Sequence, residues 1–366
     1  MDKTIKQVLL MIEAAGFEAY IVGGYVRDFI LKIKSTDIDI CTNATPKDLT
    51  AIFEEYNYKS DDYGSFKIIS DKYNVDITTY RKESKYENRK PTEVEYINNL
   101  ITDLNRRDLT INAICMNSKE VIIDLLNGIV DIETKTIRVI GDANTKLKED
   151  PLRILRAIRF ASSLDFKIED SLASAINNNK NLVANLSNTR KKEELEKILT
   201  TKKSLDGLTM LKKYGIDKYL DISYNNIIYS KDLCGMYSQI EVSDNYQFTK
   251  EEKKNITLIK EILSFGKINS KILFEYGLYL STVAGEILGM DRKDIAMMFQ
   301  SLPITSVNEI NITASDIINT LKISPSKTIK IIFDEIKEKI LDGTINNEKE
   351  DLTEYINDNK GKWDNA

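Results

Sequence analysis

Two aspartates separated by one residue, Asp37 and Asp39, are the first candidates for chemistry. Alternate residues of a β-strand lie on one face, so we expect both carboxylates to point the same way. Neighbouring like charges repel unless a cation lies between them, and Mg²⁺ prefers oxygen ligands. The pair therefore predicts a Mg²⁺ site. Asp76, on a later predicted strand, could supply a third carboxylate, and a simple edge-strand charge would explain it equally well.

A pair of glycines, Gly23 and Gly24, lies between an apolar strand-like stretch over 19–22 and a helical pattern over 25–32. Glycine lets the backbone approach a ligand closely, and a helix N-terminus presents free N–H groups and the positive end of its dipole. Both features suit a triphosphate. Together with the carboxylates they predict nucleotidyl transfer with two metal ions, although a plain turn and an exposed charge would account for each half alone.

A third candidate group follows in the sequence Arg106-Arg-Asp-Leu-Thr-Ile-Asn112, just before an apolar segment. Arg107 could clamp a phosphate or ribose while Asp108 and Asn112 hydrogen-bond locally to orient it. The competing interpretation is that Asp108 caps a helix.

A basic helix is predicted over 148–163, with Pro151 in its first turn and Asp150 at or next to the N-cap. Three arginines recur on it at every third position, namely Arg153, Arg156 and Arg159. Its core face is expected to comprise Ile154, Leu155, Ile158 and Phe160. Because like charges three residues apart repel, a purely decorative stripe is unfavourable, although a solvated basic face remains the alternative.

The start of this helix also predicts base selection. Cytosine and adenine both present an exocyclic amine beside a ring nitrogen. A carboxylate can accept a hydrogen bond from the amine, and a guanidinium can donate one to the ring nitrogen. Guanine and uracil reverse the pattern and would leave buried polar groups unpaired. Asp150 and Arg153 are therefore predicted to admit CTP and ATP and to reject GTP and UTP.

Composition narrows the chemistry further. The 366-residue chain has no histidine, which excludes Ser-His-Asp and Cys-His catalysis and histidine–metal sites. Its net charge of −5 argues against a polyanionic partner, so any nucleic-acid contact must come from local basic patches.

The cysteines, Cys41, Cys115 and Cys234, are isolated and fit reduced core residues. No apolar run reaches the roughly 18 residues of a membrane helix, and the first 17 residues resemble an amphipathic helix rather than a secretory signal. We therefore expect a cytoplasmic protein with no membrane partner.

The elements that position these residues change character near Gly141. Strands and helices alternate before it, with a hairpin over 66–69 and 74–79 that turns at Asp71-Lys72. The charged stretch over 81–91 is predicted to be a mobile loop, either a solvated connector or a lid over the site. The stretch 121–131 is expected to begin as a strand and turn at Asn127-Gly128, followed by a short return strand that ends near Val139. Helical patterns dominate after 142, including 190–199 and 327–341.

These stretches, taken in order, resemble the class II CCA-adding tRNA nucleotidyltransferases, which share a head with bacterial poly(A) polymerases. The matching motifs are Gly23 to Asp28 with Asp37-Ile-Asp39, Arg106 to Ala113, Asp124 to Asp131, Glu149 to Phe160, and Ser187 to Leu195. The segments 312–318 and 341–347 resemble the family's C-terminal, tRNA-binding part. Five ordered motifs spread over nearly the whole chain make the resemblance specific.

The resemblance implies an α+β fold with a head of mixed β-sheet and helices, followed by an all-α neck, body and tail. The implied boundaries are 1–140 for the catalytic head, 141–205 for the neck, 206–300 for the body and 301–366 for the tRNA-binding tail. It implies Asp37 and Asp39 as Mg²⁺ ligands and places at the nucleotide Gly24, Arg27, Arg107, Asp150, Arg153, Arg156 and Arg159. The oligomeric state is left open.

The implied reaction is template-independent addition of C, C and A to the tRNA 3′ end. The tRNA 3′-hydroxyl would attack the α-phosphate of CTP or ATP, with one Mg²⁺ lowering the hydroxyl pKa, the other stabilising pyrophosphate, and Arg27 and Arg107 steadying the triphosphate. An A-adding enzyme or poly(A) polymerase on the same head is one alternative. A non-catalytic RNA-binding protein is another.

Two departures from the family pattern bear on this expectation. Thr189 stands where the family usually carries an acidic residue, so the support of the nucleotide pocket is expected to differ. The segment Tyr86 to Pro91 is shorter than the family's loop pattern and has Asn88 in place of the acid. Its presence nevertheless favours addition of all three nucleotides or of the final A, because CC-only relatives are expected to lack it.

Overall fold

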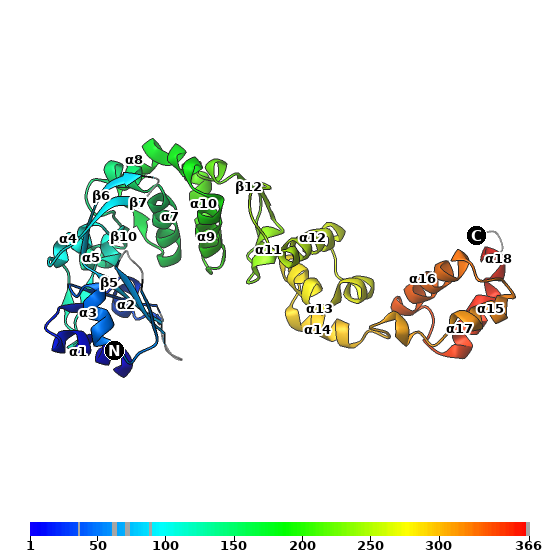
Figure 1. The fold of residues 1–366 in the computed structure, drawn as a ribbon. Helices are drawn as coiled ribbons and strands as arrows, with labels where there is room; N and C mark the ends of the chain where they lie inside the picture. Colours follow the sequence, from blue (N-terminus) through cyan, green and yellow to red (C-terminus); the bar gives the residue numbers. More distant parts are fainter. Residues whose placement is uncertain (36, 61–63, 70–73, 88–89, 364–366) are drawn as a thin grey trace. The chain divides into compact units, whose positions relative to one another are not determined.

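The computed structural model describes residues 1–35, 37–60, 64–69, 74–87 and 90–363. The chain forms two compact units, residues 1–222 and residues 223–366, and Figure 1 shows the order of their elements. The finer division at 140, 205 and 300 stays a prediction, whereas the expected α+β class, with a mixed sheet followed by helices, is confirmed.

A mixed seven-stranded sheet forms the centre of the first unit, in the order β3-β4-β5-β2-β1-β8-β9. Only β2 and β5 among these neighbours are parallel. The strands are β1 (Ala19–Val22), β2 (Ile38–Thr42), β3 (Tyr58–Ser60), β4 (Ser65–Ile69), β5 (Asn74–Thr79), β8 (Cys115–Met116) and β9 (Ile122–Ile123). The predicted hairpin is thus confirmed as β4 and β5, while its turn lies outside the described residues.

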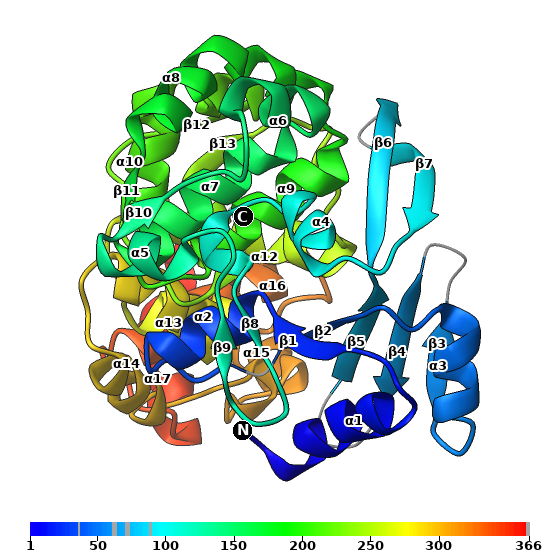
Figure 2. The ribbon, with the colours of Figure 1, turned by 90° about the vertical axis from the view of Figure 1, so that its left-hand side faces the viewer.

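The two faces of this sheet bury different side chains, as the alternation along a strand requires. Ile21 and Ile40 are fully buried on the face covered by α1 (Lys3–Ala14) and α3 (Pro46–Ile52) (Figure 2). Val22, Cys41 and Cys115 face the opposite way, in a cluster with residues of α4 (Leu100–Asn105). Both cysteines are free and buried, as predicted, and Cys234 is free and half-buried.

The charged segment predicted to be a loop is instead a two-stranded antiparallel ribbon, β6 (Arg81–Glu87) and β7 (Lys90–Tyr96), drawn apart from the main sheet in Figure 2. The loop was predicted because the segment lacks the apolar periodicity of a strand. That prediction was wrong, because polar cross-strand pairs hold the two strands together. Lys82 lies opposite Glu95, and the Ser84 hydroxyl donates to Glu93 Oε2 at 3.1 Å.

The predicted turn at Asn127-Gly128 is also wrong, because these residues begin a helix, α5 (Gly128–Glu133). Asp124 determines this outcome, since its carboxylate accepts hydrogen bonds from the backbone N–H groups of Gly128 at 3.0 Å and Ile129 at 2.8 Å. A Cβ on Gly128 would lie 2.4 Å from the Thr110 carbonyl oxygen, so only glycine fits. The expected return strand shrinks to β10 (Thr136–Ile137), parallel to β11 (Lys167–Ile168).

Helices complete the first unit. They are α2 (Gly24–Ile30), α6 (Ala143–Glu149), α7 (Leu152–Leu164), α8 (Asp170–Asn179), α9 (Asn188–Leu199) and α10 (Ser204–Tyr214), with 3₁₀ turns at Thr110–Asn112, Lys180–Asn185 and Asp217–Tyr219. The predicted helix over 148–163 is therefore two helices, because Asp150 is extended and ends α6 before Pro151 caps α7. Ile154, Leu155 and Ile158 are buried as predicted.

The second unit is mainly helical and contains two hydrophobic clusters. Its helices are α11 (Leu233–Tyr237), α12 (Lys250–Phe265), α13 (Ser270–Ile287), α14 (Arg292–Gln300), α15 (Ala314–Leu321), α16 (Lys327–Leu341), α17 (Lys349–Asp358) and α18 (Lys360–Trp363), and its strand β13 (Ile240–Val242) pairs with β12 (Ile222–Tyr224). The bounds predicted for α16 are confirmed. No helix among the described residues is long and apolar enough to cross a membrane.

Candidate active site

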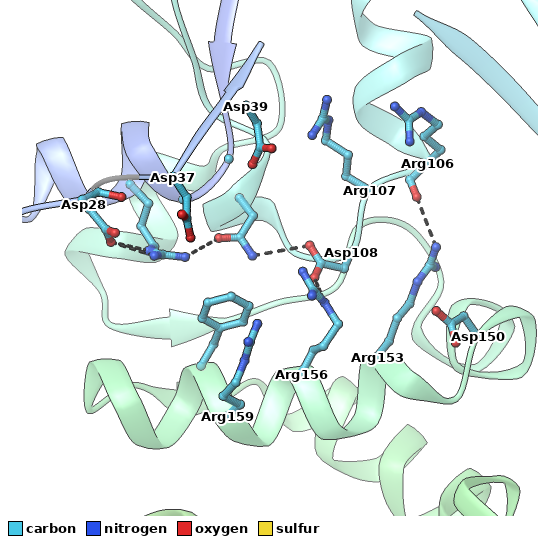
Figure 3. A pocket seen from close by; sticks show the side chains of 16 residues that line it. Asp28, Asp37, Asp39, Arg106, Arg107, Asp108, Asp150, Arg153, Arg156 and Arg159 are labelled. Atoms are coloured by element: carbon cyan, nitrogen blue, oxygen red, sulfur yellow. Dashed lines mark hydrogen bonds and ion pairs between the residues drawn. The ribbon is translucent and has the colours of Figure 1, made fainter. Parts of the chain in front are cut away.

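A cavity of about 590 Å³ in the first unit brings together the metal and nucleotide residues predicted from the sequence, with the exception of Asp76. Figure 3 shows its acidic and basic side chains converging from the start of β2, the segment before the 3₁₀ turn at Thr110–Asn112, and α7. The lining residues are Gly23, Gly24, Arg27, Asp28, Ser35, Asp37, Asp39, Arg106, Arg107, Asp108, Asn112, Asp150, Arg153, Arg156, Arg159 and Phe160. Sequence residues up to 137 apart thus meet in one place, which the spacing of the motifs alone does not show.

The two glycines form the connection between β1 and α2. Gly23 has φ of +87°, a conformation that favours glycine, and it precedes the helix that begins at Gly24. A Cβ at Gly23 would lie 3.4 Å from Asp39 Oδ2, and one at Gly24 would lie 3.5 Å from Arg27 Nη2. The glycines therefore leave room between the backbone and the charged groups of the cavity.

The aspartate pair lies on the edge of this cavity, with Asp39 inside β2 opposite Val22 and Asp37 one residue before the strand begins. Both residues are partly accessible to solvent. Partial burial of the Asp39 carboxyl raises its pKa; Arg107 acts to lower it, while Asp76 and Asp37 raise it further. A cation between Asp37 and Asp39 would relieve the repulsion between their carboxylates.

Asp76 lies beside Asp39 in the register of β2 and β5. Its carboxylate is 3.2 Å from the Lys67 ammonium, and it does not line the cavity. Within the described part of the chain, no cluster of three or more carboxylates and thiols is arranged for a metal ion. Participation of Asp76 in a metal site stays a prediction.

A chain of hydrogen bonds crosses the cavity from α2 to α7 (Figure 3). Arg27 donates to Asp28 at 2.7–2.8 Å and to the Asn112 side-chain oxygen at 2.6 Å. Asn112 in turn donates to Asp108 at 3.4 Å, and Asp108 accepts from Arg156 Nε at 2.5 Å. The prediction that Asp108 and Asn112 orient Arg107 is wrong, because they contact Arg156 and Arg27 instead.

Asp108 is held as an anion in this chain. Burial alone would raise the pKa of its carboxyl, but the adjacent Arg156 guanidinium and the backbone N–H of Leu109 hold the pKa below its usual value. Asp108 is not a helix cap, since Leu109 occupies that position before the 3₁₀ turn. Its position is explained by the ion pair with Arg156 rather than by local backbone structure.

Arg107 extends into the cavity from the other side. Its Nη2 donates to Asp103 Oδ2 at 3.2 Å, and its Nε is buried with no hydrogen-bond partner among the described residues. A buried guanidinium nitrogen without a partner is costly and is the kind of group that an anionic ligand would satisfy. The Arg107 guanidinium, which lines the cavity, thus keeps one unused donor.

Asp150 and Arg153 meet at the junction of α6 and α7. Asp150 accepts from the backbone N–H of Leu152 at 3.1 Å. Arg153 is nearly buried, and its Nη2 donates to the Arg106 carbonyl at 3.1 Å, while its Nη1 lies 3.5 Å from Glu149 and from the Lys146 carbonyl. The guanidinium therefore has one firm and two long contacts, and both side chains line the cavity.

Phe160 was assigned to the core from the sequence, but it lines the cavity. Its ring packs against three guanidinium groups, with centroid distances of 4.9 Å to Arg27, 5.7 Å to Arg156 and 4.3 Å to Arg159. Arg159 also pairs with the buried Glu194 of α9 at 3.3 Å. The interleaving of one aromatic residue with the basic stripe was the available signal for this role.

Each of the six arginines in the cavity has a carboxylate partner within 3.5 Å. The pairs are Arg27–Asp28, Arg106–Asp103, Arg107–Asp103, Arg153–Glu149, Arg156–Asp108 and Arg159–Glu194. This arrangement accommodates a strongly basic cavity in a chain of net charge −5.

Comparison with known proteins assigns the chain to a family. Residues 19–138 match the family model described as Poly A polymerase head domain. The curated CCA-adding enzyme of Ligilactobacillus salivarius is 32% identical, over 95% of this chain and 94% of its own length. The chain belongs to the CCA-adding enzymes. The curated CCA-adding enzyme of Bacillus pumilus gives the same result, with 32% identity over 95% of both chains.

Further matches concern parts of the chain and its fold. Residues 165–221 match the family model described as Probable RNA and SrmB- binding site of polymerase A, and residues 239–356 match the one described as tRNA nucleotidyltransferase domain 2 putative. The crystal structure of the Bacillus stearothermophilus CCA-adding enzyme in complex with CTP has a TM-score of 0.83 at 24% identity over 100% of both chains. The Thermotoga maritima enzyme complexed with tRNA-CCA gives 0.69 at 22% identity, over 97% of this chain and 95% of its own. Members of the family are nucleotidyltransferases that use a divalent metal ion.

Proposed function

We propose that this protein adds C, C and A in succession to the 3′ end of tRNA, taking the nucleotides from CTP and ATP without a nucleic-acid template. The observation that carries the proposal is the single cavity in which an aspartate pair, a glycine turn and six arginines meet. Membership in the CCA-adding enzymes supports the choice of tRNA as acceptor.

The proposed metal ion is Mg²⁺, bound by Asp37 and Asp39. Mg²⁺ is usually held by one or two carboxylates together with the phosphates of a substrate, so two protein ligands suffice. The raised pKa of Asp39 and the exposure of both side chains fit such a site. When bound, two such ions would supply the Lewis acidity that activates a hydroxyl and stabilises departing pyrophosphate.

The protein's own groups would position the nucleotide. Arg27 and Arg107, which both line the cavity, would hold the triphosphate beside the backbone of Gly24. Arg156 and Arg159, fixed by Asp108 and Glu194, would lie along the nucleotide on the α7 side. Asp150 and Arg153 would pair with the base edge, which accounts for acceptance of C and A but not of G and U.

The ribbon formed by β6 and β7 supports addition of the terminal A, because CC-only relatives are expected to lack this segment. Asn88, the position at which the family pattern has an acid, lies outside the described residues. Thr189, which stands where the family usually has an acidic residue, lies in the first turn of α9. The N-cap of this helix is Ser187, whose side chain accepts from the backbone N–H of Arg190. We also propose a cytoplasmic location, which fits the free cysteines.

The decisive experiment incubates the protein and Mg²⁺ with three tRNA transcripts and with each nucleoside triphosphate in turn. The transcripts end before the CCA sequence, after its first C, and after both C residues. We expect CTP to extend the first two transcripts and ATP to extend only the third, by one residue. Incorporation of ATP alone would identify an A-adding enzyme, and long A tails a poly(A) polymerase. Absence of Mg²⁺-dependent pyrophosphate release would overturn catalysis and leave a non-catalytic RNA-binding protein.

A further inference from the structure

A buried carboxylate outside the cavity contacts two of its arginines. Asp103 lies in α4, its side chain is fully buried, and it does not line the cavity. Its Oδ1 accepts from Arg106 Nε at 2.8 Å and its Oδ2 accepts from Arg107 Nη2 at 3.2 Å. One carboxylate thus fixes the directions of two adjacent guanidinium groups.

The same carboxylate contacts the base of the β6–β7 ribbon. Asp103 Oδ1 also accepts from the backbone N–H of Arg81, the first residue of β6, at 3.2 Å. Two residues further along β6, Glu83 accepts from Arg81 Nε at 2.7 Å and lies 3.5 Å from Arg106 Nη1. Arg106 is therefore held between two acidic groups, one on α4 and one on the ribbon.

Arg106 also joins this cluster to the base-selecting helix. Its carbonyl accepts from Arg153 Nη2 at 3.1 Å, which is shorter than the two contacts of Arg153 Nη1 at 3.5 Å. The turn that carries Arg106 and Arg107 is thus fixed on one side by Asp103 and on the other by α7. A change at Asp103 would reach the guanidinium of Arg107 directly and the backbone around Arg153 through Arg106.

We propose that Asp103 is a positioning residue for nucleotide binding: it holds the Arg107 guanidinium at the cavity, where this group would meet the triphosphate, and ties this geometry to the first residue of the β6–β7 ribbon. Asp103 touches no substrate itself. The competing explanation is that Asp103 only stabilises the start of α4, where an acidic residue interacts favourably with the helix dipole. The proposal rests on the proposed function, because the triphosphate is the ligand that Arg107 would contact.

The first test replaces Asp103 by asparagine, which keeps the shape but places an NH₂ group opposite one arginine. We expect the Kd of CTP and of ATP, measured by equilibrium titration without tRNA, to rise by a similar factor of roughly 10 to 100, the loss of one hydrogen bond to a charged group. The inhibition constant of pyrophosphate should rise in parallel, and tRNA binding should be unchanged. A purely structural role would lower Tm without moving any of these nucleotide constants, and that result would overturn the proposal.

Asp131→Asn is a matched control, since Asp131 is also buried, accepts from Arg138 Nε at 3.2 Å and from Thr110 Oγ1 at 2.6 Å, and does not line the cavity. We expect it to lower Tm and to leave the nucleotide Kd unchanged; an equal rise in Kd in both variants would refute a specific role for Asp103. If Asp103→Asn does not fold, Asp103→Glu keeps the charge and displaces it by one methylene. A raised Kd in that variant supports the proposal, and an unchanged Kd overturns it.

The outcome is separable from that of the proposed function. Titration of CTP and ATP requires neither tRNA nor turnover, whereas addition of C, C and A is read from the tRNA product of the unaltered protein. A protein that fails to extend tRNA can therefore still show, or fail to show, the effect of Asp103 on triphosphate binding.

Discussion

Replacing Arg153 by alanine tests whether the protein itself reads the base. The guanidinium makes one firm contact, to the Arg106 carbonyl at 3.1 Å, and two long contacts at 3.5 Å. Removing it leaves one buried carbonyl without its charged donor, which we expect to cost about 2 kcal/mol of the free energy of unfolding. Loss of a bidentate base contact is worth about 1–3 kcal/mol of discrimination, so selectivity for CTP over UTP should fall roughly 5- to 150-fold.

The assay measures kcat/KM for incorporation of CTP, ATP, UTP and GTP into tRNA transcripts that lack the 3′ CCA. Arg292→Ala is a suitable control, because Arg292 is an exposed arginine of α14 that pairs with Glu286 at 2.9 Å and lies outside the five matching motifs. It should leave both selectivity and stability unchanged. If Arg153→Ala lowers activity for all four nucleotides by the same factor, selectivity is intact and the base-edge interpretation of Arg153 is refuted.

Three further predictions concern the metal pair and the fold. Asp37→Ala or Asp39→Ala should abolish incorporation while tRNA binding, measured by gel shift, survives; retained turnover would contradict the metal assignment. The pKa of Asp39 is higher in the folded protein than in the unfolded chain. Above the folded-state pKa the ionised carboxylate therefore lowers the free energy of unfolding. This destabilisation shrinks as the pH falls through the folded-state pKa, and it is gone below the pKa of the unfolded chain. Asp39→Asn should therefore raise Tm at neutral pH without metal, with a gain that shrinks on acidification; a lower Tm at neutral pH would argue against it. Gly128→Ala should destabilise the protein by about 2 kcal/mol or more in urea, because the new Cβ would meet the Thr110 carbonyl at 2.4 Å, whereas Gly361→Ala, with no neighbour within 4 Å, should be nearly neutral.

Elements with strong local signals could be predicted from the sequence. The apolar run of β1, the Thr45–Asp48 capping box of α3 and the amphipathic pattern of α16 each fix their element through nearby residues. The errors arose where distant or polar partners decide the conformation. Asp124 turns Asn127-Gly128 into a helix start by accepting N–H groups that a hairpin would use differently, and cross-strand polar pairs stabilise β6 and β7 without any apolar period.

The membership of the site was predictable, but its connections were not. Each motif pointed to one kind of ligand group, and the fold brings all of them to one cavity. The motifs do not indicate, however, which of their side chains interact. Arg27 donates a hydrogen bond to Asn112, which is 85 residues away in the sequence, and Arg156 pairs with Asp108, which is 48 residues away. Asp103 and Glu194 were missed as partners for the same reason, because a buried carboxylate acts on whichever guanidinium the fold brings near it.

The pairing of every cavity arginine with a carboxylate bears on repeated turnover. An entering triphosphate would add a second anionic partner to guanidinium groups that a carboxylate already partly neutralises, so we expect only part of a full charge–charge attraction to appear as affinity. When pyrophosphate leaves, Asp28, Asp103 and Asp108 would still hold their guanidinium groups. Carboxylates that stay in place would allow the product to leave after each of three successive additions to one RNA end, without the protein having to reorganise its charges in between.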